Sequence, residues 1–516
     1  RGRRSAACAA WAAVAAGAVP RGCAAALHPA LASGAAADWT ALIQVGLSTE
    51  PEAWPSTARR REAAAAATSA PAKRGVVGNN RQLMINQGDV EYVSHMTVGK
   101  QTVVGIMDTG SFELVVFSTE CQSCGTAAKY SPKASSSHST GSLMTVQSYG
   151  SGDTYSWEAA DEVQIGPFPK KKQTFWEVVD ARMPILKSAN FEAIIGLGPP
   201  ETPAADSWAE VQTALTGINK YYAEARHPPA DVAQTVKDAI DAAVEMSASP
   251  TMLDNFEIKT FSLCMGSKPG ADGYIIWEDA SAFAYPERFT TIEVMGKHTW
   301  SVALSNVRLT KPGTFTDNKI DCFDGKQCTA LVDSGTSLLA VPKGVVEKIQ
   351  DIVANMGADC DLSRLPSLMF ELGGNMLSLP PDAYVAQTSG SVSSEMTSLV
   401  RIRDVSGGGN RQTGETCKVL LMESYMDSKQ GPLWIFGMPF FRKYYTSFHV
   451  GTGSTKRALH VAEANDDCEP GAAGASLARS RSTQARRIDV SRLHAPPLLR
   501  GSRYTSNVSV RVRVQP

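Results

Sequence analysis

The feature that most constrains the fold of this chain is a short motif that occurs twice, far apart in the sequence. Residues 106–111 read Ile-Met-Asp-Thr-Gly-Ser, and residues 331–337 read Leu-Val-Asp-Ser-Gly-Thr-Ser. Each copy places an aspartate directly after an apolar strand end and before a glycine that allows a sharp turn. Because a buried carboxylate is costly unless it is paired or used, the motif predicts two related halves that bring Asp108 and Asp333 together.

Two neighbouring carboxylates in a buried site cannot both ionise cheaply, so they share one proton and titrate as a pair. The ionised aspartate can take a proton from water while its protonated partner donates to a peptide carbonyl. The residues around the aspartates fit this chemistry. Ser111 and Thr336 are expected to hydrogen-bond the outer carboxylate oxygens, and Thr109 and Ser334 to tie the two loops together. The glycines that supply the two turns are Gly110 and Gly335.

Short apolar runs between turn residues predict β-strands over most of residues 88–468. Residues 142–148 and 155–165 read as the arms of a hairpin, with Tyr-Gly-Ser-Gly-Asp at its tip, residues 149–153. Residues 203–247 break this pattern, because their apolar positions recur at helical spacing and predict a helical insertion.

These motifs resemble the two active-site loops of the pepsin-like aspartic proteases, and their combination is similar to plasmepsin and cathepsin D type members. The hairpin tip matches that family's flap, and the glycines at the ends of 194–196 and 435–437 match its two characteristic loops. The resemblance covers about residues 88–468. It implies an all-β, bilobal fold with a central cleft, here with the helical insertion in or near the first lobe.

The resemblance also assigns roles around the cleft. Tyr149, Gly150 and Ser151 would close over the substrate. Ile185 and Ile194 would line an apolar substrate pocket, although a core position is an equal alternative for both. Where the family has a tryptophan that supports the flap, this chain has Val115, which puts the support of Tyr149 in question.

Ten cysteines are present, and an even set in an exported chain favours disulfides. Cys121 and Cys124 are close enough in sequence to close a small disulfide loop. The family resemblance implies four pairings, which are Cys121–Cys124, Cys322–Cys328, Cys360–Cys417 and Cys264–Cys468. The eight histidines show no metal-binding spacing such as HExxH, so neither a metal nor another cofactor is expected.

A formal net charge of −1 gives no bulk attraction to nucleic acid or to an anionic membrane. A basic start, an apolar run and small residues are typical of a secretory signal at 1–26, and no later run is long enough for a membrane span. We therefore expect a monomer in the secretory pathway, with an extracellular or an acidic vacuole- or lysosome-like destination. The remaining segments are expected to be a zymogen-type propeptide leader at 27–87, lobes at 88–255 and 256–468, and a basic disordered tail at 469–516.

The sequence thus predicts an aspartic endopeptidase that cuts extended protein or peptide chains between apolar residues, with an acidic optimum. The alternative is a protease-like binding protein that keeps the fold and has weak or no turnover. The intact Asp108, Asp333 and Tyr149 favour the enzyme, whereas Val115 favours the alternative.

Overall fold

The structure is a computed structural model that describes residues 80–200, Val211, Ala243 and 250–516, the last range with gaps at 297–298, 311–316, 321–327, 355–360, 405–416, 426, 429–430, 452–455, 472–484, 496–511 and 514–516. Apart from Val211 and Ala243, these residues belong to one compact unit, formed by Val76–Asp206 and Ser249–Pro516. The fold is described here for that unit.

Two large sheets make up the unit. The first has fourteen strands, in the spatial order β11 (Thr290–Glu293), β24 (Ala458–Glu463), β23 (Tyr444–His449), β9 (Thr260–Met265), β10 (Gly273–Trp277), β1 (Arg81–Asn86), β2 (Tyr92–Val98), β3 (Gln101–Asp108), β8 (Ala193–Gly196), β4 (Leu114–Phe117), β7 (Lys171–Arg182), β6 (Gly152–Ile165), β5 (Ser139–Tyr149) and β26 (Val512–Arg513). Strands from both ends of the chain therefore meet in one sheet.

The second sheet has twelve strands and is built only from residues after 300. Its main path is β17 (Asn375–Leu379), β16 (Ser367–Leu372), β12 (Ser301–Thr310), β14 (Cys328–Val332), β22 (Gly431–Phe436), β15 (Leu339–Pro342), β20 (Cys417–Ser424), β18 (Val385–Ser389) and β25 (Arg486–Asp489). Three further strands flank this path: β13 (Asp317–Lys319) on β12, β19 (Val400–Asp404) on β20 and β21 (Asp427–Ser428) on β22.

Helices are few and short among the described residues. They are α5 (Met252–Asn255), α6 (Ser281–Ala284), α7 (Val345–Ala354) and α8 (Met438–Lys443). β-strands account for most of the described residues, so the prediction of a mostly β chain is confirmed. No helix of the described part is long and apolar enough to cross a membrane.

The two sheets repeat one local topology. In the first, β3 pairs in parallel with β8, which pairs antiparallel with β4. In the second, β14 pairs in parallel with β22, which pairs antiparallel with β15. Because β3 and β14 each run directly into one of the two aspartates, the duplicated sequence motif corresponds to a duplicated structural unit.

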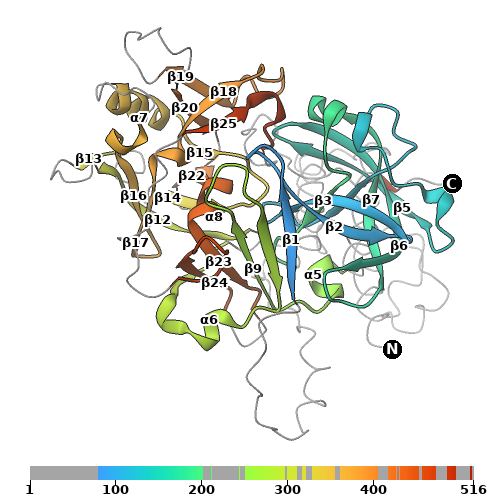
Figure 1. Ribbon diagram of the computed structural model, residues 1–516. Coiled ribbons are helices and arrows are strands. Elements are labelled where there is room, and N and C mark those ends of the chain that lie inside the picture. The colour runs from blue at the N-terminus through green and yellow to red at the C-terminus, as the bar shows by residue number, and fades with distance from the viewer. Residues whose placement is uncertain are drawn as a thin grey trace, which may run out of the picture. The chain divides into compact units, whose positions relative to one another are not determined.

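The structure adds strands that the sequence patterns did not reveal. β1 lies in the segment that the sequence assigned to a leader ending at residue 87, and it pairs with both β2 and β10. Figure 1 shows β1, in blue, beside strands that come much later in the chain. The first-lobe fold of the described chain therefore begins at least seven residues earlier than the expected residue 88, with Arg81.

The tail expected to be disordered, residues 469–516, is partly ordered. Residues 486–489 form β25, which pairs in parallel with β18 and appears red in Figure 1. A 3-10 turn, η11 (Val490–Arg492), continues from it, and the chain is described as far as Ala495. Arginine-rich composition suggested a solvated chain, but its apolar residues Ile488, Val490 and Leu493 are buried. The expected signal segment, the leader up to residue 79 and the helical insertion lie outside the described residues, except that Val211 and Ala243 are helical.

Candidate active site

The two aspartate loops meet face to face at the ends of β3 and β14. Asp108 and Asp333 are both fully buried. The Gly110 N–H donates to Asp108 Oδ1 at 2.9 Å, and the Gly335 N–H donates to Asp333 Oδ1 at 2.8 Å. The sharp turn after each aspartate thus returns a backbone donor to the carboxylate that precedes it.

Hydroxyl groups hold the other carboxylate oxygens. Ser111 donates to Asp108 Oδ2 and Thr336 donates to Asp333 Oδ2, each at 2.5 Å. Each aspartate therefore has one backbone and one side-chain donor in matching positions. The spacing of the motif produces this match, because the hydroxyl residue stands three positions after the aspartate in both copies.

A reciprocal set of hydrogen bonds joins the two loops beneath the aspartates. Thr109 Oγ1 donates to the Val332 carbonyl and accepts from the Ser334 N–H, both at 2.9 Å. Ser334 Oγ donates to the Met107 carbonyl at 2.6 Å and accepts from the Thr109 N–H at 3.2 Å. All four groups are buried, so the cross-link is shielded from water and fixes the distance between the two strand ends.

Each motif glycine lies against the opposite aspartate. A Cβ atom added to Gly335 would lie 2.2 Å from Asp108 Oδ1, and one added to Gly110 would lie 2.5 Å from Asp333 Cγ. These distances are far below ordinary van der Waals contact. Only a hydrogen atom fits at either position, so the glycines permit the close approach of the two carboxylates as well as the turns.

Burial raises the pKa of Asp333 well above its usual range, and the nearby charge of Asp108 and a hydrogen bond with that carboxylate act in the same direction. The donors on Thr336 and Gly335 oppose this rise without cancelling it. Two acids that share a dry site hold a proton between them in this way. The arrangement favours one protonated and one ionised carboxyl group side by side.

Tyr149 ends β5 at the tip of the predicted hairpin, with Gly152 opposite it as the first residue of β6. The ring of Tyr149 is almost completely buried. Burial, with the charges of Glu113 and Asp108, raises the pKa of Tyr149 well above its usual value, so its phenol keeps its proton. Gly150 and Ser151 form the turn between the two strands.

A polar network beside the hairpin was not foreseen from the sequence. Val115, which replaces the expected tryptophan, is buried and pairs across the sheet with Trp176 on β7. The Trp176 indole N–H donates to Glu113 Oε1 at 2.9 Å, and the Gln147 amide donates to Glu113 Oε2 at 3.4 Å. The network thus links Trp176 to β5, the strand that carries Tyr149. Nothing in the sequence around Trp176 indicated this role.

The other expected site residues are placed as follows. Ile185 lies in the 3-10 turn η6 (Pro184–Ser188), and Ile194 lies within β8, opposite Ile106 and Val115. Both are buried, and no ligand contact distinguishes a pocket role from a core role. Their assignment to a substrate pocket remains a prediction.

Two of the expected disulfides are present in the described chain, Cys121–Cys124 and Cys264–Cys468. Cys417 is also in a disulfide. The expected partners of Cys328 and Cys417 are Cys322 and Cys360, which lie outside the described residues. Those two pairings therefore remain predictions.

The space between the hairpin tip and the second aspartate loop holds a segment of the same chain. The Gly150 N–H donates to the Ala495 carbonyl at 3.1 Å. His494 donates its N–H to Ser337 Oγ at 2.8 Å, and its carbonyl accepts from the Ser337 N–H at 3.1 Å. The His494 Nδ1 lies 2.7 Å from the Gly335 carbonyl, and its ring centroid lies 6.0 Å from that of Tyr149.

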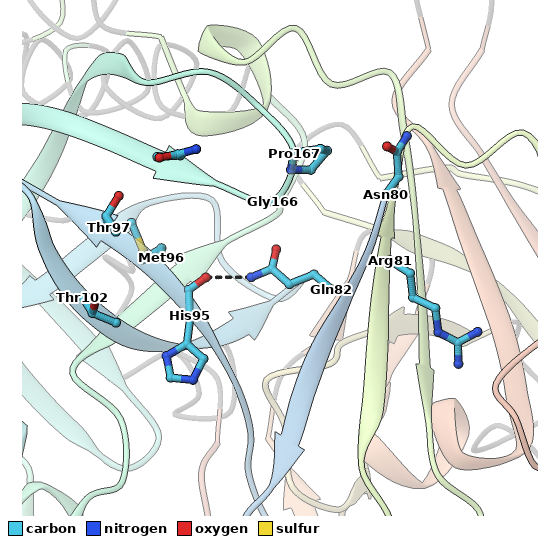
Figure 2. Close-up of a pocket in the computed structure, with 10 residues that line it drawn as sticks. Asn80, Arg81, Gln82, His95, Met96, Thr97, Thr102, Gly166 and Pro167 are labelled. Carbon is cyan, nitrogen blue, oxygen red and sulfur yellow. Dashed lines mark hydrogen bonds between the residues drawn. The ribbon is translucent and has the colours of Figure 1, made fainter. Parts of the chain in front are cut away.

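A separate pocket of about 430 Å³ lies away from the aspartates, at the edge formed by β1, β2 and the end of β6. Figure 2 shows the Gln82 amide and the His95 carbonyl facing each other there, joined by a 2.6 Å hydrogen bond. Neither aspartate lines it. Within the described ranges, no group of three or more His, Cys, Asp or Glu side chains is arranged to hold a metal ion.

Comparison with known proteins identifies the family. The model of a family described as eukaryotic aspartyl protease matches residues 91–220 and 242–459, which include both aspartate loops and the hairpin. The chain belongs to the eukaryotic aspartyl protease family. It is therefore a hydrolase, an aspartic-type endopeptidase with that family's bilobal, mostly β fold.

Several curated proteins are similar to this aspartyl protease over most of their length. Cathepsin E of Aquarana catesbeiana is 27% identical over 380 residues, covering 71% of this chain and 79% of that protein. Cathepsin E of Rattus norvegicus is 26% identical over 390 residues, covering 73% and 82%. Pepsin A of Bos taurus is 24% identical over 393 residues, covering 72% and 85%.

Proposed function

We propose that this endopeptidase hydrolyses peptide bonds with a water molecule activated between Asp108 and Asp333. The observation that carries the proposal is the matched pair of buried carboxylates, each held by a backbone and a hydroxyl donor. The two acids have equivalent supports but share one proton, which is the condition for concerted acid and base catalysis.

Asp333 is assigned the proton, because burial and the neighbouring carboxylate raise its pKa. Asp108 takes a proton from water as the water oxygen bonds to the peptide carbon, and Asp333 gives its proton to the carbonyl oxygen. The resulting diol collapses when Asp333 takes back a hydroxyl proton, Asp108 gives its proton to the amine nitrogen and the C–N bond breaks. No covalent enzyme intermediate forms, and both aspartates return to their initial states.

Tyr149 and the turn residues Gly150 and Ser151 are assigned to substrate binding. Support comes from the Gly150 N–H, which already donates to a peptide carbonyl, that of Ala495. A backbone donor at this position binds any extended peptide regardless of its sequence. Apolar specificity is supported by the packing of Leu493 and Ile488 in one cluster with Leu331 and Ile435, next to the second aspartate loop.

The disulfides Cys121–Cys124 and Cys264–Cys468 support an exported protein, because such bonds persist in oxidising compartments. The raised pKa of Asp333 supports work at acidic pH. We assign this protease to the secretory pathway, with an extracellular or acidic vacuolar destination, as a monomer acting on proteins or peptides.

Replacement of either aspartate tests the assignment. In the parent chain, a statine-type inhibitor should block the cleavage of acid-denatured globin. Asp108→Asn and Asp333→Asn should each abolish that cleavage. Asp279→Asn is a matched control, because Asp279 is also buried but accepts its hydrogen bonds from Ser262 and Ser281, away from the dyad. Retained cleavage in the Asp108 or Asp333 variant would refute the mechanism. A parent chain that binds the inhibitor without cutting would favour the alternative of a protease-like binding protein.

A further inference from the structure

The segment of residues 485–495 is bound on both sides of the proposed catalytic centre. The flap residue Gly150 binds the Ala495 carbonyl from one side, and Ser337 binds both backbone groups of His494 from the other. Main-chain capture of an extended segment is the way in which proteases and other peptide-binding proteins hold their ligands. The segment therefore uses the contacts that a peptide substrate needs.

Apolar side chains fix the segment in the second lobe. Ile488, Val490, Leu493 and Ala495 are buried in a cluster that also contains Leu331, Ile435 and Leu338. Leu331 is the first residue of the second aspartate motif, and Leu338 directly follows its last residue, Ser337. Ile488, Val490 and Leu493 therefore anchor the segment by removing their apolar side chains from water.

Two arginines of the segment are paired with buried carboxylates. Arg486 lies 2.8 Å from Asp89, and Arg492 lies 2.8 Å from Glu91, with all four side chains partly or wholly buried. Arg486 also donates to the Lys268 carbonyl at 3.3 Å. Because a buried charge without its partner is costly, these pairs allow the segment to dock in one register only.

Docking of this segment closes the site. Asp108 and Asp333 are fully buried, and His494 and Ala495 lie between the second aspartate loop and the hairpin tip, against Gly335, Tyr149 and Gly150. A peptide substrate that enters between the loop and the tip must therefore displace them. The segment itself is not positioned for cleavage, since the carbonyls of His494 and Ala495 are engaged by the N–H groups of Ser337 and Gly150. The match to the family model ends at residue 459, before this segment begins.

We propose that residues 485–495 are an intramolecular inhibitor that occupies the substrate position of this protease. The proposal rests on the function assigned to the dyad. The segment follows Cys468 after a short stretch of chain. The disulfide between Cys468 and Cys264 fixes that point of the chain to β9 of the first sheet. A short tether gives an effective concentration on the order of 1 mM, so a segment with a dissociation constant of about 10 μM would be docked about 99% of the time.

Leu493→Asp in the full chain tests the proposal, because Leu493 belongs to the segment and the substitution removes an anchor without touching the dyad. We expect a statine-type inhibitor to bind this variant at least about tenfold more tightly than the parent, with a matching rise in the rate of peptide cleavage. Arg487→Lys is the matched control, since Arg487 is exposed on the same segment and lysine keeps a donor for Gln387. The control variant should leave both quantities unchanged.

Equal inhibitor affinity in the parent and in Leu493→Asp would overturn the proposal. If the variant binds the inhibitor more tightly but neither chain cleaves peptide, the segment occupies the site and the assigned function fails instead. A second measurement does not depend on the variant's folding. A synthetic peptide of residues 485–495 should inhibit the Leu493→Asp chain competitively, and a scrambled peptide of the same composition should not; equal inhibition by both would also refute the proposal.

Discussion

Substitution of Gly335 by alanine should destroy catalysis while leaving the fold intact. The new Cβ would lie 2.2 Å from Asp108 Oδ1 and 2.6 Å from Asp108 Cγ. Because ordinary contacts of this kind are about 3.5 Å, the carboxylate or the loop must move by about 1 Å. A displacement of that size at reacting groups costs on the order of 100-fold in rate. We therefore expect kcat/KM for an apolar peptide to fall about 100-fold in Gly335→Ala.

The assay measures initial rates at acidic pH with and without Gly335→Ala, both in the parent chain and in the Leu493→Asp chain. The second background ensures that docking of residues 485–495 does not mask the effect. Gly374→Ala is the control, because Gly374 has a φ of +81° and its added Cβ would meet nothing within 4 Å. That variant should lose about 1 kcal/mol of unfolding free energy through backbone strain and keep its kcat/KM. A Gly335→Ala enzyme with parental activity would show that the two carboxylates do not need their close approach.

Three further predictions concern the supports of the site. Thr109→Val removes both hydrogen bonds of the Thr109 hydroxyl and leaves the buried Val332 carbonyl and Ser334 N–H without that partner. The free energy of unfolding, measured by chemical denaturation, should therefore fall by about 2–4 kcal/mol. An unchanged denaturation midpoint would contradict the cross-link. Trp176→Phe removes the donor to Glu113 and should lower kcat/KM about tenfold without moving its pH profile; a shifted profile would instead place Trp176 in the dyad's own environment. Docking of residues 485–495 should weaken as the pH falls. Burial lowers the pKa of His494 below its usual 6.5, against the raising effect of Asp108. The undocked segment therefore binds the proton more strongly, and docking free energy is lost below pH 6.5. Of the groups against the ring, Tyr149 stays neutral, and His494 Nε2 is buried with no acceptor among the described residues. Inhibitor affinity should thus rise from pH 7 to pH 5 in the parent and change less in His494→Gln; equal slopes would refute the role of His494.

The dyad could be predicted because each half of it is encoded locally. Asp108, its turn glycine and its hydroxyl donor lie within four consecutive residues, and the same holds for Asp333. The duplication then implied the meeting of the two halves, which the cross-link between Thr109 and Ser334 shows. The hairpin that carries Tyr149 was predictable for the same reason, since turn chemistry and strand pattern are both local.

Contacts between distant parts of the chain were not predictable in this way. Arg486 pairs with Asp89, 397 residues earlier, and no local pattern around either residue announces the other. Composition marked the tail as basic and solvated, although its arginines alternate with the buried Ile488 and Val490. The indole of Trp176 is likewise brought beside Val115 only by the parallel pairing of β4 and β7.

The pH dependence of kcat/KM in the Leu493→Asp chain, measured with a peptide that has no ionisable side chain, tests the central claim most directly. Because Asp333 must carry a proton and its pKa is raised, activity should persist at acidic pH and fall as the pH rises through that pKa. It should also fall at the lowest pH, where the pair takes up its second proton and no carboxylate is left to accept a proton from water. A bell-shaped profile with an acidic maximum is the predicted result, and a rate that stays constant from pH 4 to pH 8 would contradict the shared-proton mechanism.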